Sequence, residues 1–239
     1  MTDVRDLYLD LMARCLADAI YDDANPLVRA EGLDWPARAH TMIGLKRLAN
    51  IRHCVEDVLA RDVPGDLCEA GAWRGGAAIY LRAILAAHAD DARRVWVADS
   101  FQGLPPPDPT RYPHDAGDRH HTHAQLAVPL DDVRANFARH GLLDDQVCFL
   151  PGWFRDTLPA APIERLAVLR LDADMYESTI QCLEALYDRL SPGGYLIVDD
   201  YGGIEQCRKA VHDFRAARGI RAPIKPIDWT GVYWQIPER

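Results

Sequence analysis

Four short apolar runs, separated by stretches with helical periodicity, constrain the fold of this chain more than any other feature. The runs are GDLCEAG (65–71), RRVWVADS (93–100), LAVLRLDAD (166–174) and GGYLIVDD (193–200). Apolar runs of this length, closed by glycine or acidic residues, are typical of buried strands. Because they alternate with helices, they predict an α/β fold with a doubly wound, mostly parallel sheet that helices cover on both faces.

The rest of the chain fits this alternation. We expect helices at 3–22, at about 36–60, in GGAAIYLRAILAAHA, and near 130–140, 177–190 and 205–218. Further strands are expected in QVCFLPG, IKPID and GVYWQI. The first two helices would form a helical N-terminal extension or lid over residues 1–60, in front of one Rossmann-like domain at 61–239. The Pro- and His-rich stretch 104–129 is interpreted as an ordered loop or lid.

Composition and charge argue against several kinds of partner. The 239 residues carry a formal net charge of −9, whereas a surface that binds nucleic acid needs an excess of basic residues. No apolar run approaches the roughly 20 residues of a membrane span, and the start MTDVRDLYLD is too polar for a signal peptide. The six cysteines lack CxxC spacing, so we interpret them as reduced core residues of a cytoplasmic protein.

A glycine-rich turn, CEAGAWRGG (68–76), joins the first strand to its helix. Its glycines let the backbone approach a ligand closely. Glu69, at the strand end, would repel a pyrophosphate but attract an ammonium or sulfonium group, and Asp99 can accept both hydroxyls of a ribose. Together they favour S-adenosylmethionine over NAD. The alternative is that Glu69 is a solvated strand-end residue and Asp99 a helix cap.

Two further strands end in pairs of carboxylates. Asp172 and Asp174 follow one strand, and Asp199 and Asp200 follow the next, which we expect to be its neighbour in the sheet. Several carboxylates this close raise one another's pKa unless a cation compensates them. Oxygen ligands without thiolates suit Mg²⁺, with Ca²⁺ or Mn²⁺ as alternatives. The competing interpretation makes Asp199 a cofactor contact, Asp200 the N-cap of the next helix and Asp172 a salt-bridge partner of Arg170.

Long motifs over residues 36–236 resemble one known family, the macrocin O-methyltransferases. The motifs are CEAGAWRGGAAIYLRA, VADSFQGLPPPD, NFARHGLLDDQVCFLPGWFRDTLP, LAVLRLDADMYEST, GGYLIVDDYGG, CRKAVHDFR and GVYWQ. These enzymes depend on S-adenosylmethionine and Mg²⁺ and methylate sugar hydroxyls of glycosylated antibiotics, as in macrolide and aminocoumarin pathways. The resemblance therefore implies a class I methyltransferase of the Rossmann-like type with a small-molecule glycosylated acceptor. It also implies a cytoplasmic homodimer or larger homo-oligomer.

The same resemblance implies which residues form the site. It implies metal ligation by Asp172, Asp199 and Asp200. The implied cofactor contacts are Thr41, Met42, Glu69, Gly71, Ala72, Trp73, Arg74, Gly75, Gly76, Asp99, Ser100, Phe101, Gln102, Trp153, Phe154 and Asp172. The metal would chelate two neighbouring hydroxyls of a deoxysugar, one of which attacks the sulfonium methyl group in line.

The proton acceptor is left open between two candidates, and the acceptor sugar is also left open. Family members vary in length and residues in the loop that corresponds to 110–128, and this loop is expected to close over the substrate. A histidine just before LAV would match a base proposed for the macrolide enzymes. Here that is most nearly His121, with His120 and His123 close by. Asp174 is the rival, because it would lie near the metal.

Three other functions stay open at this stage. A catechol-type O-methyltransferase would use the same chelation chemistry on a flat aromatic diol. A nucleotide- or metal-binding module would bind without turnover. An NAD-dependent oxidoreductase is disfavoured by Glu69, for the charge reason given above.

Overall fold

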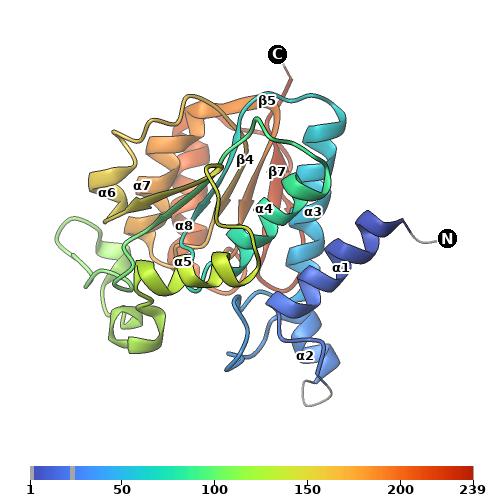
Figure 1. Cartoon of the computed structure of the whole chain (residues 1–239). Helices are drawn as coiled ribbons and strands as arrows, with labels where there is room; N and C mark the ends of the chain where they lie inside the picture. Colours follow the sequence, from blue (N-terminus) through green and yellow to red (C-terminus); the bar gives the residue numbers. More distant parts are fainter. Residues whose placement is uncertain (1–2, 22–24, 239) are drawn as a thin grey trace.

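A seven-stranded sheet forms the centre of the molecule in the computed structural model, which describes residues 3–21 and 25–238 (Figure 1). The strand order is β3-β2-β1-β4-β5-β7-β6. The first five strands in this order run parallel, and β7 is antiparallel to both of its neighbours. The strands are β1 (Asp66–Ala70), β2 (Val95–Asp99), β3 (Val147–Pro151), β4 (Leu166–Leu171), β5 (Leu190–Val198), β6 (Lys225–Pro226) and β7 (Val232–Gln235). The predicted α/β fold with a mostly parallel sheet is confirmed.

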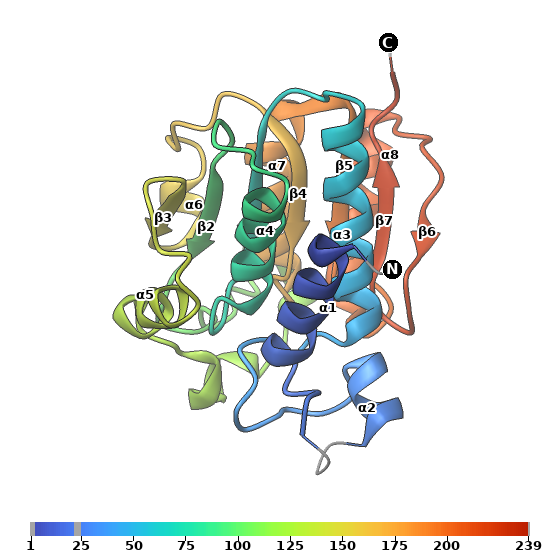
Figure 2. The ribbon, with the colours of Figure 1, turned by 45° about the vertical axis from the view of Figure 1, so that its right-hand side comes forward.

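Helices cover both faces of this sheet and enclose two apolar cores. Helices α1, α3, α4 and α5 supply side chains to one core, whereas α7 and α8 supply the other (Figures 1 and 2). The helices are α1 (Val4–Leu16), α2 (Pro26–Glu31), α3 (Leu45–Ala60), α4 (Gly76–Ala87), α5 (Leu130–Arg139), α6 (Phe154–Thr157), α7 (Tyr176–Leu186) and α8 (Glu205–Arg218). Because helices cover both faces, the strands are apolar almost throughout, as the sequence pattern predicted.

The strand register brings the ends of β1, β4 and β5 to one level. Ala70 pairs with Leu171, and Leu171 pairs with Val198. The residues that follow continue the ladder, since the Asp172 N–H donates to the Ala70 carbonyl and the Asp199 N–H donates to the Leu171 carbonyl, each at 2.9 Å. The carboxylates after β4 and β5 therefore emerge side by side, as expected for neighbouring parallel strands.

The N-terminal part contains less regular helix than the sequence suggested. The expected helix at 3–22 ends at Leu16, because Asp18 adopts a left-handed φ of 55°. The expected helix at 36–60 begins only at Leu45, and the short α2 was not expected. Residues before Leu45 form hydrogen bonds outside any helix: the His40 N–H donates to the Leu16 carbonyl at 2.8 Å. Residues 1–2, 22–24 and 239 of the expected units lie outside the described part of the chain.

Two further boundaries differ from expectation. The helix expected at 177–190 is α7 followed by a 3₁₀ turn, Tyr187–Arg189. The segment 104–129, which we call the lid segment, contains three 3₁₀ turns: Pro113–Asp115, His120–Thr122 and Ala124–Leu126. All six cysteines are free, four of them buried, which fits reduced core residues. Within residues 3–21 and 25–238, no helix has the length and apolar character needed to span a bilayer.

The N-terminal segment and the lid segment lie on either side of the edge where the parallel strands end. Figure 2 shows the blue N-terminal segment and the green lid segment at this same end of the sheet. The Gly76 N–H, at the start of α4, donates to the His40 carbonyl at 2.8 Å. Helix α3 packs on α4, β4 and β5. The carboxyl edge of the sheet is thus covered by chain from two distant parts of the sequence.

Candidate active site

A pocket opens at the carboxyl ends of the parallel strands, where ligands bind in open α/β sheets. Its walls come from the ends of β1, β2 and β4, from the lid segment and from the starts of α6 and α7. The lining residues are Met42, Gly71, Trp73, Asp99, Ser100, Gly103, Leu104, Pro105, Leu126, Trp153, Phe154, Arg155, Asp172, Ala173, Asp174, Glu177, Ser178 and Gln181.

Nine of the twenty site residues proposed from the sequence line this pocket. They are Met42, Gly71, Trp73, Asp99, Ser100, Trp153, Phe154, Asp172 and Asp174. The other eleven are not part of its lining: Thr41, Glu69, Ala72, Arg74, Gly75, Gly76, Phe101, Gln102, His121, Asp199 and Asp200. The pocket therefore gathers side chains from segments more than 100 residues apart in the sequence.

The glycine-rich turn is shaped by Asp99 and by close backbone packing. The Asp99 carboxylate accepts hydrogen bonds from the backbone N–H groups of Ala72 and Phe101, each at 2.7 Å. Gly71 has a φ of 92°, and a Cβ there would lie 1.7 Å from the Asp172 carbonyl oxygen. Only glycine fits this position. Trp73 also has a positive φ, of 48°, an uncommon conformation that tends to occur at functional sites.

The N-terminal segment is bonded to the same turn. One guanidinium nitrogen of Arg74 donates to the carbonyls of Ala37 and Ala39, each at 2.9 Å. A Cβ at Gly76 would approach the His40 carbonyl oxygen to 2.4 Å, so the segment and the turn are in direct backbone contact. Thr41 accepts from the Ile43 N–H at 3.3 Å, which holds Met42 in a tight turn at the pocket wall.

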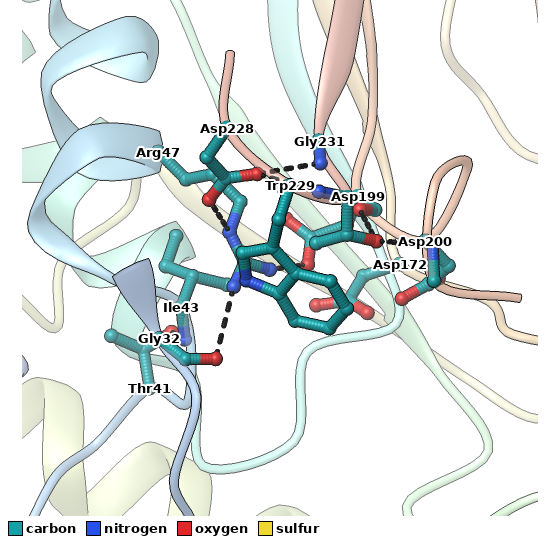
Figure 3. Close-up of polar contacts among 12 residues, drawn as sticks. Gly32, Thr41, Ile43, Arg47, Asp172, Asp199, Asp200, Asp228, Trp229 and Gly231 are labelled. Carbon is teal, nitrogen blue, oxygen red and sulfur yellow. Dashed lines mark hydrogen bonds and ion pairs between the residues drawn. The ribbon is translucent and has the colours of Figure 1, made fainter. Parts of the chain in front are cut away.

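Asp172, Asp199 and Asp200 form a cluster beside the pocket (Figure 3). One carboxylate oxygen from each lies within 4.8 Å of the others. Both backbone N–H groups after Asp172, those of Ala173 and Asp174, donate to Oδ2 of Asp200, at 3.1 and 3.0 Å. These contacts use one oxygen of Asp200 and leave Oδ1 for a ligand. The carboxylates that the sequence placed on neighbouring strands are therefore brought together.

Two buried arginines contact this cluster. The salt bridge between Asp172 and Arg170, expected only in the competing interpretation, is present, whereas Arg47 was not expected. Arg170 donates to Asp199 at 2.5 Å, to Asp172 at 2.9 Å and to Glu69 at 2.5 Å. Arg47, from α3, donates to the other oxygen of Asp199. A charged residue within the apolar run LAVLRLDAD was the available signal for Arg170, whereas nothing in the sequence around Arg47 points to the site.

Arg170 also explains the position of Glu69. This carboxylate is buried and forms its ion pair with Arg170, rather than lining the pocket. Burial raises the pKa of Glu69 to about 8, although the Arg170 charge acts in the opposite direction. Glu69 thus fixes the guanidinium that in turn contacts Asp172, which does line the pocket.

The arginines do not neutralise the whole cluster. Burial, followed by the charges of Asp174, Asp172 and Asp199, raises the pKa of Asp200 well above its usual value. Burial and the Asp199 charge raise the pKa of Asp172 to about 6, and burial and the Asp172 charge raise that of Asp174 to about 7. Of these four carboxyl groups, only that of Asp199, which both arginines contact, has a lowered pKa. This excess of negative charge is the environment a divalent cation would favour.

Residues 4–236 match the macrocin-O-methyltransferase family. The chain belongs to this family. It is 58% identical, over 98% of its length and 94% of the relative's, to the 8-demethyl-8-(2,3-dimethoxy-alpha-L-rhamnosyl)-tetracenomycin-C 4'-O-methyltransferase of Streptomyces olivaceus. It is 53% identical, over 96% of its length and 93% of the relative's, to the demethyldecarbamoylnovobiocin O-methyltransferase of Streptomyces niveus. It is similar to the solved structure of the O-methyltransferase NovP, with a TM-score of 0.91, 51% identity, and coverage of 98% of this chain and 100% of that one.

As a member of the macrocin-O-methyltransferase family, the chain is an O-methyltransferase, and S-adenosylmethionine is its methyl donor. The resemblance inferred from the sequence motifs is confirmed. The family match covers the glycine-rich turn, the lid segment and all three clustered aspartates. Binding without turnover and NAD-dependent oxidation, both considered at first, do not fit this assignment.

The lid segment of this O-methyltransferase is attached at two points, Asp115 and Gln125. Buried Asp115 accepts from the backbone N–H groups of Tyr176 and Glu177, at 2.7 and 2.8 Å, and so caps α7 from another part of the chain. The Trp73 indole N–H donates to the Gln125 carbonyl at 2.9 Å. The lid segment is therefore connected to the loop after β4 and to the glycine-rich turn.

Among the lid histidines, His120 bonds to Asp118 and interacts with the charge of Asp174. Its Nδ1 lies 2.7 Å from Oδ2 of Asp118. Burial alone would lower the pKa of His120, but the hydrogen bond with Asp118 and the charge of Asp174 raise it on balance. His121 lies exposed in the same 3₁₀ turn and is not part of the pocket lining. Asp174, the rival candidate for the base, lines the pocket.

Proposed function

We propose that this enzyme methylates a sugar hydroxyl of a glycosylated natural product, and that Mg²⁺ held by Asp172, Asp199 and Asp200 is required. The observation that carries the metal role is the cluster itself: three carboxylate oxygens within 4.8 Å, with more negative charge than the two arginines balance. The sugar acceptor is supported by the relative at 58% identity, whose name specifies methylation of a rhamnosyl tetracenomycin.

The residues present fit a magnesium ion. The backbone N–H groups that donate to Asp200 use Oδ2, so Oδ1 can bind a metal ion. Each oxygen of Asp199 accepts one arginine N–H, from Arg170 or Arg47, and keeps a second lone pair for a metal ion. All the metal ligands would be carboxylate oxygens, which Mg²⁺ prefers, whereas softer metals prefer nitrogen or sulfur. When bound, the ion would lower the pKa of a neighbouring hydroxyl and help to orient it.

The methyl donor would occupy the pocket beside the cluster. Asp99 lies at the end of β2, where a carboxylate can accept hydrogen bonds from ribose hydroxyls. Trp153 and Phe154 offer aromatic and apolar surface to the adenine ring of the donor. Asp172 belongs both to the pocket lining and to the carboxylate cluster. This shared residue would place the donor's methyl group close to the hydroxyl that the cluster orients.

Asp174 is the residue that we propose as proton acceptor. It lines the pocket and follows Asp172 by two residues, whereas His121 is exposed outside the lining. Asp118 and His120 lie in the lid segment on the side of Asp174, where a positively charged imidazole would stabilise the ionised carboxylate. A base near the operating pH is well matched to this task.

The decisive experiment removes one metal ligand and spares the cofactor pocket. In Asp200→Asn we expect methyl transfer to a glycoside to fall at least about 100-fold, in the range seen when general catalytic groups are lost. The dissociation constant of S-adenosylhomocysteine should stay within about two-fold, because Asp200 does not line the pocket. Asp213→Asn, an exposed carboxylate paired with Lys209, is the control.

Two results would contradict the proposal. Full activity in excess EDTA would exclude a required divalent ion. Methylation of catechol but of no glycoside would show that the enzyme acts on aromatic diols instead. Titration of Mn²⁺, followed by its electron paramagnetic resonance signal, tests the ligand set without any turnover.

We also propose that the enzyme is a homodimer or larger homo-oligomer and acts in the cytoplasm. Helix α1 exposes Val4, Leu7 and Leu11, at 79%, 62% and 52% of their surface, and their spacing places them along one side of the helix. Such a row of exposed apolar side chains favours contact with another subunit. Light scattering during size-exclusion chromatography checks the assembly. The six free cysteines support a reducing compartment.

A further inference from the structure

Trp229, in the loop between β6 and β7, is a large aromatic side chain with half of its surface exposed. Its ring is nevertheless held in one orientation. The indole N–H donates to the Glu31 carbonyl at 2.9 Å, and the ring lies so close to Gly203 that a Cβ there would be 3.0 Å from it. Exposed apolar residues are common, but an exposed indole fixed from two sides presents a rigid flat surface.

This surface lies next to the cluster of Asp172, Asp199 and Asp200. The Thr230 hydroxyl donates to the carbonyl of Asp199 at 3.0 Å and accepts from the Gly203 N–H at 3.0 Å, which joins the loop of Trp229 to the turn after β5. Arg47 adds a second connection, because it contacts Asp228 at 2.9 Å as well as Asp199. Figure 3 shows the Trp229 side chain together with the three aspartates and Arg47.

The turn after Asp200 packs closely on the loop of Trp229. Gly202 and Gly203 carry no side chains, and a Cβ at Gly202 would approach the Trp229 carbonyl oxygen to 2.3 Å. Trp229 is absent from the lining of the cofactor pocket, whose aromatic residues are Trp73, Trp153 and Phe154. The cluster thus has the cofactor pocket on one side and an exposed indole on another.

We propose that the exposed face of Trp229 stacks on the sugar ring of the acceptor and so determines which glycosides reach the three clustered aspartates. A pyranose ring presents an apolar C–H face and a polar edge of hydroxyls. The indole beside the carboxylates matches both, since the apolar face would cover the indole while two hydroxyls point toward Asp199 and Asp200. This inference rests on the proposed sugar O-methyltransferase function and adds a specificity-determining residue to it.

The test compares Trp229→Leu, which keeps apolar bulk, with Trp229→Phe, which keeps a flat ring. Acceptors are p-nitrophenyl α-L-rhamnopyranoside, demethyldecarbamoylnovobiocin and catechol, each assayed with S-adenosylmethionine and Mg²⁺. For the glycosides we expect Trp229→Leu to raise KM at least about 10-fold with kcat within about three-fold, and Trp229→Phe to recover most of this loss. Tyr21→Ala, which removes another exposed aromatic side chain, is the control.

Two further measurements separate stacking from a structural role. The affinities for S-adenosylhomocysteine and for Mn²⁺ should stay within about two-fold of wild type in both variants, because Trp229 is not part of the pocket lining and its indole N–H donates to a backbone carbonyl. If these affinities fall together with the acceptor affinity, Trp229 only supports the loop, and the proposal is wrong. Equal KM values for Trp229→Leu and wild type with glycosides would also overturn it.

The outcome for wild type distinguishes this inference from the proposed function. If wild type methylates a glycoside and Trp229→Leu has an unchanged KM, only the role of Trp229 fails. If wild type methylates catechol but neither glycoside, the sugar O-methyltransferase function fails, and the stacking inference fails with it.

Discussion

Replacing Arg170 with methionine removes the cation that contacts Glu69, Asp172 and Asp199 simultaneously. Methionine approximates the length of the arginine stem, so the change is mainly one of charge and hydrogen bonding. Arg170 is almost completely buried, as are Glu69 and Asp199. The variant would therefore leave several carboxylates in the protein interior, of which Asp199 keeps its ion pair with Arg47.

The magnitude follows from the burial of these groups. Removing one partner of a buried ion pair costs about 3–5 kcal/mol, because the remaining charge stays out of water. For a chain of this length, each kcal/mol lowers the melting temperature by about 2–4 °C, so a decrease of about 6–20 °C is expected. Part of the cost should be offset in the double variant Glu69→Gln/Arg170→Met, which also removes one of the stranded negative charges.

The assay is guanidinium unfolding, together with calorimetry, in EDTA and without cofactor, so that ligand binding does not contribute. Arg82→Met is the matched control. Arg82 is also buried, but the Asp144 carboxylate that it contacts is 41% exposed, so a loss of about 1 kcal/mol is expected there. If Arg170→Met is destabilised by no more than this control, the carboxylates are not held by Arg170 as described.

Three further outcomes test the site and its surroundings. The pKa of His40 is lowered to about 4, chiefly by burial and then by the charge of His140. Between pH 6.5 and 4 the unfolded chain therefore binds a proton that the folded protein does not, so the free energy of unfolding is greatest above pH 6.5 and falls as the pH decreases toward 4. His40→Gln should flatten this fall in acid unfolding curves. Asp115→Ala should cost about 1–2 kcal/mol, like the loss of a helix cap, and raise the acceptor KM without weakening S-adenosylhomocysteine binding. Asp174→Asn should lower kcat at least about 100-fold while His121→Gln changes it less than about three-fold; the reverse result would make the histidine the base.

The sequence predicted the sheet and the position of its acidic residues well, for a physical reason. Parallel strands buried on both faces are nearly continuous apolar runs, so their ends are visible, and neighbouring ends must meet at one edge. Asp172, Asp199 and Asp200 could be placed together on this basis alone. The helix expected at 36–60 was less predictable, because the backbone groups of His40 and Thr41 bond to Leu16 and Gly76 instead of forming a helical turn.

The charges that surround the cluster were harder to predict. Arg47 lies 125 residues before Asp172 on an amphipathic helix, and its sequence neighbours give no indication that it contacts Asp199. Trp229 is similar, since its orientation depends on a carbonyl 198 residues away. Such contacts depend on how distant segments pack, which local periodicity does not encode. The choice between His120 and His121 likewise needed the turn geometry of the lid segment.

The two attachment points of the lid segment define where it could be exchanged between related enzymes. Asp115 bonds to the start of α7 through its side chain, whereas position 125 offers Trp73 only a backbone carbonyl. A graft that replaces residues 116–124 would leave both attachment points intact. At position 125, where only the backbone carbonyl is used, any residue that keeps the backbone conformation would preserve the bond to Trp73. Residues 116–124 could therefore be exchanged as one nine-residue segment while both attachments are kept, although Asp118 and His120 beside Asp174 belong to that segment.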